Sequence, residues 1–209
     1  RKAASARTID AIDLPIFGDH NIQNALAAIA IASEMGIEDE ILRKALVNFE
    51  GVKRRFTKTG EIDGVTIIDD YGHHPVEITA VLAAARAASD GQVIAIVQPH
   101  RYSRLRDLFE DFCTCFNDAD AVLVADVYPA GEQPIEGIDR DALAQGLRER
   151  GHRTVMPLVD VDLLPGIIND LTGPGDLVVC LGAGNITQWA NELPEKLRML
   201  RYGSEGGGE

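Results

Sequence analysis

The sequence predicts an α/β fold in which a mostly parallel sheet carries helices on both faces. From about residue 53 onward, segments rich in β-branched residues alternate with helical segments, which is the pattern of βαβ units. The chain has 209 residues, of which 45% are hydrophobic, and this is enough for one domain and part of another. Two helical segments come before the first strand.

These two helical segments lack strands of their own. Asn21–Met35 is rich in Ala and Ile and is predicted to end at Gly36, because glycine readily adopts the left-handed conformation that closes a helix. Glu38–Phe49 is more amphipathic and is predicted to end at Gly51. Helices without a sheet indicate that residues 1–52 are the end of a neighbouring domain, so we interpret the chain as a fragment.

Residues 53–202 are predicted to form a complete α/β domain. An extra strand at Thr57–Ile62 is expected to turn at Asp63-Gly64 into the next one. The main strands are predicted at Val65–Asp69, Gln92–Val97, Ala121–Ala125, Thr154–Pro157 and Leu177–Leu181. The helices are predicted at Pro75–Ala88, Ser103–Phe116, Arg140–Arg150, Val161–Asp170 and Ile186–Leu197. The tail, 203–209, has four glycines among seven residues and is predicted to be disordered.

Composition excludes several classes of protein. With 20 basic and 33 acidic residues the net charge is −13, which argues against non-specific nucleic-acid binding, because that needs clustered Lys and Arg. No apolar run approaches the roughly 20 residues that span a bilayer, and the first residues do not form a signal peptide. We therefore expect a cytoplasmic protein without membrane or nucleic-acid partners.

The chain has three cysteines, Cys113, Cys115 and Cys180. An odd number with one C-x-C pair fits neither a disulfide framework nor a tetrahedral zinc site. The first two fall in a helical pattern and the third in a strand-like apolar run. We interpret all three as buried structural thiols.

The sharpest candidate site is Asp69-Asp70-Tyr71-Gly72-His73-His74-Pro75. It follows an apolar strand, and Pro75 can occupy the first position of the next helix. Ligands of open α/β sheets bind at this end of the strands. Packing or capping accounts for one Asp but not for the whole set, and adjacent residues rarely all bind one metal ion.

A second segment, Gln98-Pro99-His100-Arg101-Tyr102-Ser103-Arg104, also lies between an apolar strand and a helix, on the same rim of the sheet. Arg101 and Arg104 are three residues apart and can converge on one carboxylate or phosphate. The alternative is that both form surface ion pairs. Two cations on the first turn of a helix are unfavourable unless an anion is present, so we favour an anionic substrate group.

Three weaker segments also carry polar groups. His20, Asn21 and Asn24 lie at a helix start, where the ring and the amides could contact a flat ligand, although capping by Asn21 or Asp19 is the simpler interpretation. Lys53-Arg54-Arg55 could bring charge to a phosphate, or could be a solvated linker. The G-x-G at Gly182-Ala183-Gly184 lacks the third glycine of a dinucleotide fingerprint and is interpreted as a tight strand-to-helix turn.

Together, these segments resemble the bacterial Mur ligase family in order and spacing, over residues 18–198. Within the family, D-D-Y-G-H-H-P followed by Q-P-H-R-Y-S-R is most similar to the branch that adds L-alanine to UDP-N-acetylmuramate. The next most similar branch joins a tripeptide to the same nucleotide sugar during recycling. The resemblance implies a Rossmann-like C-terminal domain at residues 53–202, preceded by the end of the central ATP-binding domain at residues 1–52.

The resemblance also implies roles for particular residues. His20, Asn21 and Asn24 would contact the ATP adenine, Arg55 (with Arg54 as the alternate) the ATP phosphates, and Asp70 the ribose. Tyr71 and His73 would face the reacting substrates, and Arg101 and Arg104 would bind alanine or the muramyl carboxylate region. ATP would phosphorylate the lactyl carboxylate, and the alanine amine would attack the acyl phosphate during peptidoglycan precursor synthesis.

The sequence contains no G-x-x-x-x-G-K-[ST] phosphate loop. We therefore expect the Mg²⁺ ligands and the UDP-binding domain in a missing N-terminal part, and an inactive fragment. Two alternatives from other classes remain. One is a non-catalytic nucleotide-binding α/β module, and the other is a metal-dependent hydrolase that uses Asp69, Asp70, His73 and His74.

Overall fold

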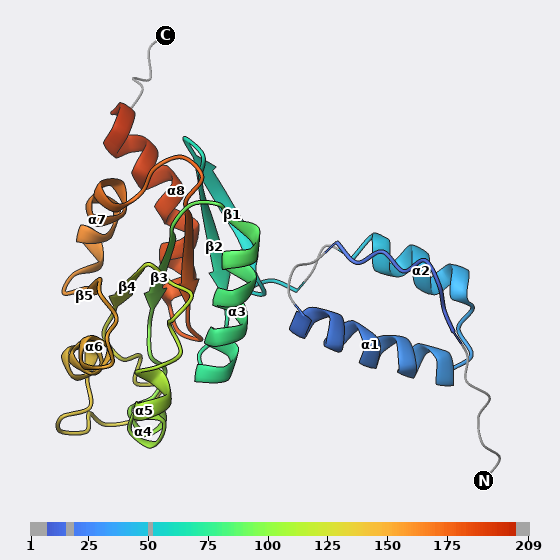
Figure 1. Cartoon of the computed structure of the whole chain (residues 1–209), viewed down its shortest axis with the longest axis horizontal. Helices are drawn as coiled ribbons and strands as arrows, with labels where there is room; N and C mark the ends of the chain where they lie inside the picture. Colours follow the sequence, from blue (N-terminus) through green and yellow to red (C-terminus); the bar gives the residue numbers. More distant parts are fainter. Residues whose placement is uncertain (1–7, 16–18, 50–51, 204–209) are drawn as a thin grey trace. The chain divides into compact units, whose positions relative to one another are not determined.

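The computed structural model describes residues 8–15, 19–49 and 52–203, without the side chains of Asp19 and His20. It divides into two compact units, residues 1–52 and 53–209 (Figure 1). Each is described by itself below. Of the predicted tail, only Gly203 belongs to the described residues.

The first unit contains two helices, α1 (Asp19–Glu34) and α2 (Asp39–Val47). Gly36 follows α1 with a φ of 75°, and the Ile37 N–H donates to the carbonyl of Ala32, as in a Schellman motif. The predicted C-terminal glycine is thus confirmed. Because α1 already begins at Asp19, Asn21 lies inside the helix, and capping by Asn21 is wrong.

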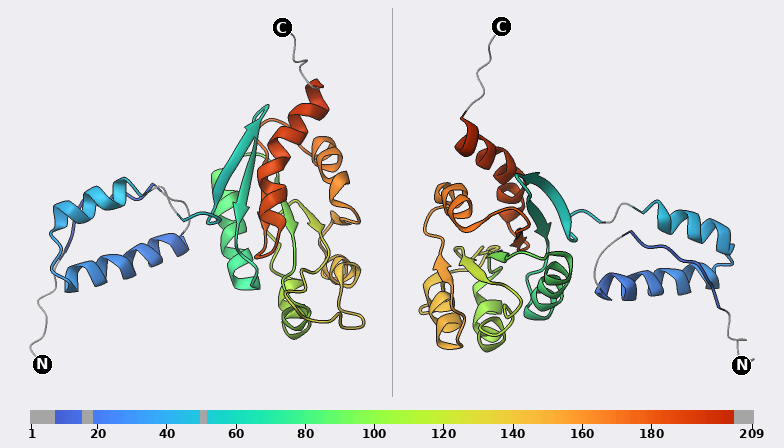
Figure 2. Two further views of the ribbon diagram at one scale, coloured as in Figure 1. Left: turned by 180° about the vertical axis from the view of Figure 1, so that it is seen from behind. Right: turned by 45° about the horizontal axis from the view of Figure 1, so that its top comes forward.

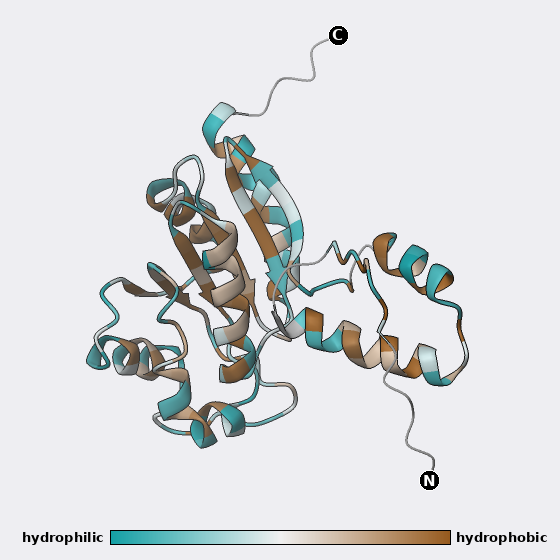
Figure 3. Ribbon diagram, turned by 45° about the vertical axis from the view of Figure 1, so that its right-hand side comes forward, coloured by the Kyte–Doolittle hydropathy of each residue, from teal (hydrophilic) through white to brown (hydrophobic). Residues whose placement is uncertain are grey.

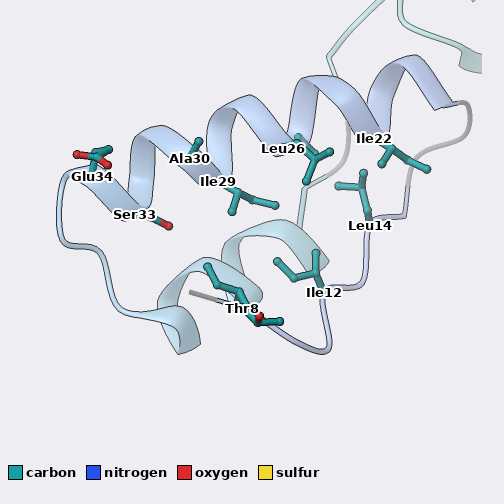
Figure 4. Close-up of a pocket in the computed structure, with 11 residues that line it drawn as sticks. Thr8, Ile12, Leu14, Ile22, Leu26, Ile29, Ala30, Ser33 and Glu34 are labelled. Carbon is teal, nitrogen blue, oxygen red and sulfur yellow. The ribbon is translucent and has the colours of Figure 1, made fainter. Parts of the chain in front are cut away.

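A groove of about 800 Å³ runs along one face of α1 (Figure 4). Apolar side chains from the helix and from the segment at residues 8–14 line it, among them Ile12, Ile22, Leu26 and Ile29. Ile22 is 50% exposed and Leu26 is 58% exposed. Among the described residues of the first unit, this apolar face of α1 is therefore only partly covered.

The second unit contains a six-stranded sheet in the order β1-β2-β6-β3-β4-β5. Only β1 is antiparallel to its neighbour; the other pairs are parallel, which confirms the predicted mostly parallel sheet. The strands are β1 (Thr57–Ile62), β2 (Val65–Asp70), β3 (Val93–Val97), β4 (Ala121–Val124), β5 (Val155–Pro157) and β6 (Leu177–Leu181).

Helices cover both faces of this sheet, as predicted (Figure 2). One face packs against α3 (Pro75–Ala88), α4 (Tyr102–Asp107), α5 (Phe109–Phe112) and α6 (Arg140–Glu149). The other packs against α7 (Leu164–Leu171), which follows the short helix η1 (Val161–Leu163), and against α8 (Ile186–Tyr202). The strands between the two helical layers are strongly hydrophobic (Figure 3).

The predicted single helix Ser103–Phe116 is wrong, because the chain breaks it at Leu108, where φ is −119° and ψ is 23°. Leu105, Phe109 and Phe112 all pack into the same core on either side of the break. Their spacing of four and three residues is the pattern of one continuous helix, so the apolar pattern could not reveal the break.

All three cysteines are free and buried, as predicted. Burial is the main cause that raises the pKa of each thiol above its ordinary value, most strongly for Cys115 and Cys180. No helix among the described residues is long and apolar enough to cross a membrane.

Candidate functional site

The carboxyl ends of the parallel strands bring the segments after β2, β3 and β4 together. The rings of Tyr71 and His73 have centroids 5.2 Å apart, His73 and His100 are 5.7 Å apart, and His100 stacks on Tyr128 at 5.4 Å. The strand order places β6, the last strand in the chain, between β2 and β3. The order of the strands therefore reverses at this point of the sheet, and open α/β sheets bind ligands at such a reversal. We call these four residues the ring ladder.

Asp70, which directly precedes Tyr71 of the ring ladder, is fully buried. Its two carboxylate oxygens accept hydrogen bonds of 2.7 Å from the backbone N–H groups of Phe56 and Gly72. These bonds join the segment that enters β1 to the end of β2. The ribose contact of Asp70 stays a prediction, and in this structure the carboxylate organises the two loops around the site.

Asp69 and Arg54 form a second buried connection. The Asp69 carboxylate accepts a hydrogen bond of 2.6 Å from the Thr187 hydroxyl and lies 3.7 Å from the Arg54 Nε. The Arg54 guanidinium also donates to the carbonyl oxygens of Gly182 and Gly184. The side chain of Arg54 is thereby committed to holding the β6–α8 turn.

Arg55 differs from its neighbour because it is exposed. The guanidinium carbons of Arg54 and Arg55 lie 4.8 Å and 5.9 Å from the centroid of the Tyr71 ring. Arg54 adopts a φ of 60° and Phe56 a φ of 53°, a backbone region that side chains rarely enter. Since Arg54 is engaged with the protein, Arg55 is the arginine of this segment that faces solvent, next to exposed Lys53.

His73 and His74 directly precede helix α3, and His74 is its N-cap. The His74 side chain accepts from the Val76 N–H, and the Glu77 carboxylate accepts from the His74 N–H at 3.2 Å, which completes a capping box. The same Glu77 oxygen accepts from the His73 N–H at 3.0 Å. His74 thus has a structural role, whereas the His73 ring belongs to the ring ladder.

Arg101 and Arg104 follow His100 at the start of α4. Arg104 Nη1 donates to the His100 carbonyl at 3.1 Å and lies 3.4 Å from Nδ1 of its ring. Arg101 precedes the helix with a φ of 75° and is exposed. Burial is the main cause that lowers the pKa of His100, followed by the positive charges of His73, Arg104 and Arg101.

Glu132 is a residue that the sequence analysis missed, as it also missed Tyr128 and Glu77. Its carboxylate accepts from the N–H and the hydroxyl of Ser103, at 2.9 Å and 2.6 Å, and lies 3.6 Å from Arg101 Nη1. The premise that this turn lacks an anion of its own is therefore wrong, because the loop after β4 supplies one. Glu132 is 28 positions from Arg104, so local spacing carried no signal of it.

The G-x-G segment is a tight turn, as predicted. A Cβ on Gly184 would meet the side-chain oxygen of Gln98 and would lie 2.7 Å from Tyr128 Cγ. Buried Gln98 donates to Asn185 at 2.8 Å and accepts from the Ile186 N–H at 3.2 Å. The glycines therefore let the turn approach Gln98 and the ring ladder.

The residues predicted to contact adenine belong to the first unit. His20 lies in α1, and its side chain falls outside the described part of the chain. Asn21 is buried and Asn24, one turn further, is exposed. No group of three His, Cys, Asp or Glu side chains that could hold a metal ion occurs among the described residues.

The second unit is thus a Rossmann-like α/β domain with an aromatic, imidazole and guanidinium site at the carboxyl edge of its sheet. The chain belongs to the Mur ligase family, because residues 54–184 match the family described as Mur ligase, glutamate ligase domain. This confirms the resemblance seen in the sequence.

Relatives extend the match to the first unit. The chain is 66% identical over 200 residues to a UDP-N-acetylmuramate–L-alanine ligase of Bradyrhizobium sp., covering 96% of this chain and 43% of that protein. A protein of the same name from Paramagnetospirillum magneticum is 62% identical over 209 residues, covering 100% of this chain and 44% of that protein. The chain therefore spans less than half the length of these relatives.

Two solved structures have folds similar to that of this chain. The UDP-N-acetylmuramate–alanine ligase of Thermotoga maritima is 26% identical with a TM-score of 0.75, over 90% of this chain and 40% of that protein. A murein peptide ligase of Psychrobacter arcticus is 23% identical with a TM-score of 0.62, covering 94% of this chain and 40% of that protein, and it shows the fold alone.

Proposed function

We propose that this chain is part of an ATP-dependent ligase that adds L-alanine to UDP-N-acetylmuramate in cytoplasmic peptidoglycan precursor synthesis. The observation that carries the proposal is the 66% identity to a protein named for this activity, extending over 96% of the chain. The described site is compatible with it, since the reaction needs cations for carboxylate and phosphate groups and rings that shape a small pocket.

ATP and Mg²⁺ are the proposed cofactors. When bound, Mg²⁺ would neutralise the phosphates of ATP, and we assign its ligands to the part of the longer protein that precedes this chain. Residues 1–52 would be the end of that central ATP-binding domain, which agrees with the exposed apolar face of α1. His20, Asn21 and Asn24 would contact the adenine there.

On the second unit, exposed Arg55 is the better candidate than Arg54 for the ATP phosphates. Asp70 would contact the ribose if its loops rearranged in the complex, because its oxygens are now bonded to backbone N–H groups. Tyr71 and His73 would face the reacting groups. The strained backbone at Arg54, Phe56 and Arg101 lies close to two rings of the ladder, since Arg54 contacts Tyr71 and Arg101 follows His100, as expected where geometry serves a ligand.

Arg101 and Arg104 would bind a carboxylate of alanine or of the muramyl group. Arg104 already contacts His100, and Arg101 has Glu132 as its partner at 3.6 Å. An incoming carboxylate would share Arg101 with Glu132. Arg101→Ala or Arg104→Ala in the complete protein should raise the KM for alanine or UDP-N-acetylmuramate, or lower kcat, without loss of fold.

The test joins this chain to its missing N-terminal part and measures phosphate release from ATP with UDP-N-acetylmuramate and L-alanine. Alanine-dependent release by the complete protein, and none by this chain alone, supports the proposal. Release that depends on a tripeptide instead of alanine would assign the recycling reaction. ATP binding without any release would favour a non-catalytic module, and a stoichiometric metal at Asp69, Asp70, His73 and His74 would favour a hydrolase.

A further inference from the structure

Two histidines of the ring ladder, His73 and His100, are held in opposite hydrogen-bonding states. Nδ1 of His73 lies 2.9 Å from the carbonyl oxygen of Tyr71, and a carbonyl oxygen can only accept. Nδ1 of a neutral His73 therefore carries the proton, and Nε2 carries the lone pair. Within the described part of the chain, the hydrogen bonds of His73 use only its backbone N–H and Nδ1.

His100 is set the other way. Its Nδ1 lies 3.4 Å from Arg104 Nη1, and a guanidinium can only donate. Nδ1 is therefore the acceptor, and Nε2 of a neutral His100 carries the hydrogen. Burial and the neighbouring guanidinium groups of Arg104 and Arg101 lower the pKa of His100, whose Nε2 carries the hydrogen, whereas Nε2 of His73 carries a lone pair that can accept one.

The Glu77 carboxylate lies next to Nδ1 of the His73 ring. Its Oε2 is 3.5 Å from Nδ1 of His73 and accepts the backbone N–H groups of His73 and His74, so the carboxylate is fixed from three directions. Burial, the largest influence, raises the pKa of Glu77, but the His73 and His74 N–H groups and the charges of His73 and Arg55 lower it overall. Glu77 is thus held as an anion beside the Nδ1 side of the ring.

A carboxylate beside the protonated nitrogen of a histidine stabilises the imidazolium that forms when the opposite nitrogen accepts a proton. In the part of the chain that the structure describes, the charged and titratable groups in contact with His73 are Tyr71, Glu77 and His100, with Arg55 near Glu77. Glu77 is the one anion in this set. The other carboxylates of the site are turned to Arg54 and to backbone N–H groups or, in Glu132, to Ser103 and Arg101.

We propose that Nε2 of His73 accepts a proton from the incoming amine in the ligase reaction, and that Glu77 is the positioning residue that holds His73 in this state. The inference rests on the proposed function. The amino acid arrives as an ammonium ion, and its N–H bond must break before the nitrogen lone pair can attack the acyl phosphate.

The step balances as follows. One ammonium proton moves to Nε2 of His73, and the freed nitrogen lone pair forms the C–N bond at the acyl carbon. The tetrahedral intermediate then breaks its bond to the phosphate oxygen, and the second proton lost by the nitrogen goes to the leaving phosphate. His73 afterwards returns its proton to solvent.

The experiment uses the complete protein and compares two nucleophiles, L-alanine and hydroxylamine. Hydroxylamine is already unprotonated at neutral pH and traps an acyl phosphate as a hydroxamate. His73→Gln should lower alanine-dependent kcat/KM by roughly 10²- to 10⁴-fold, the usual contribution of an acid–base group, and leave hydroxamate formation close to wild type.

Glu77→Gln preserves the hydrogen-bond acceptor for the two N–H groups but removes the charge. It should lower the alanine rate by less than His73→Gln and move the acidic limb of the alanine pH profile to lower pH, because the imidazolium loses its anion. His152→Gln is the matched control, since His152 contacts the carbonyl of Ala119 at the opposite edge of the sheet, 3.0 Å away.

Equal losses with both nucleophiles in His73→Gln would overturn the inference, as would an unshifted pH profile in Glu77→Gln. A wild-type protein that forms hydroxamate but does not use alanine would instead overturn the proposed acceptor. Circular dichroism and thermal unfolding of each variant separate a loss of fold from these outcomes.

Discussion

At the amino edge of the sheet, Asp176 accepts the backbone N–H groups of Gln92 and Gly173 at 2.7 Å and 2.8 Å, and at the carboxyl edge Asp70 accepts those of Phe56 and Gly72. Both carboxylates are buried. The two edges therefore use the same device, in which a carboxylate joins two loops by satisfying their N–H groups.

The two edges of the sheet differ in the side chains that surround this buried carboxylate. At the amino edge, the next carboxylate, Asp120, accepts from the Val93 N–H and pairs with Arg86. At the carboxyl edge, Arg55, Tyr71 and Arg101 are exposed above the buried layer. A buried acidic residue at a strand end is thus no mark of a site by itself, and the exposed cations and rings make the distinction.

We expect the largest effect from substituting two adjacent arginines at the carboxyl edge, because Arg55 should serve turnover and Arg54 should serve stability. Arg55→Ala in the complete protein should lower turnover about 10²-fold or more, as expected when a donor to developing charge is lost. Arg54→Ala should lower the free energy of unfolding by about 2–3 kcal/mol, because Asp69 and the carbonyls of Gly182 and Gly184 lose their partner.

Steady-state turnover and urea unfolding of both variants test this assignment. A folded Arg54→Ala that has lost turnover, beside an active Arg55→Ala, would exchange the roles of the two residues.

The next effect compares Asp70→Asn with Asp176→Asn. Each removes the charge from a carboxylate with two backbone donors, so both should lose about 1–3 kcal/mol of stability. Only Asp70→Asn should also weaken ATP binding, by about 1–3 kcal/mol, in the complete protein. An equal ATP KM in the two variants would leave Asp70 with a structural role alone.

The third comparison is between two glycines, where we expect an effect on stability alone. Gly184→Ala should lower stability by about 1–3 kcal/mol, because its methyl group would overlap Gln98 and Tyr128. Gly173→Ala, near the amino edge, meets nothing within 4 Å and should stay within about 0.5 kcal/mol of wild type. Urea midpoints measure both, and equal midpoints would show that the β6–α8 turn tolerates a side chain.

The smallest expected effect is a change in stability at acidic pH. Burial raises the pKa of Asp120, but Arg86, the Val93 N–H and His152 lower it overall from its ordinary value of 3.8. A lowered folded pKa contributes stability that is present above the unfolded value and lost as pH falls through the folded value. The advantage of wild type over Asp120→Asn should therefore shrink below pH 3.8.

Urea midpoints from neutral pH downward measure this difference. A gap between wild type and Asp120→Asn that stays constant with pH would show that the Arg86 pair contributes nothing through charge.

Much of the fold followed from local pattern. The alternation of apolar strands and helices predicted the parallel sheet, and Gly36 predicted a helix end, because both depend on residues close in sequence. The two polar segments after β2 and β3 were expected on one rim, since parallel strands end at the same edge. Their family resemblance was also visible in the sequence alone.

The tertiary structure decided which of these side chains are exposed to a ligand and which are engaged with the protein itself. The sequence could not show that Arg54 is engaged with the protein while Arg55 is exposed. Nor could it show that Asp70 is buried while Tyr71 is exposed, because burial depends on which residues pack against each side chain. Glu132 reaches Arg101 and Ser103 from a loop after another strand, and Tyr128 stacks on His100 from the same loop. Such contacts depend on strand order, which places distant loops side by side, and spacing along the chain carries no record of it.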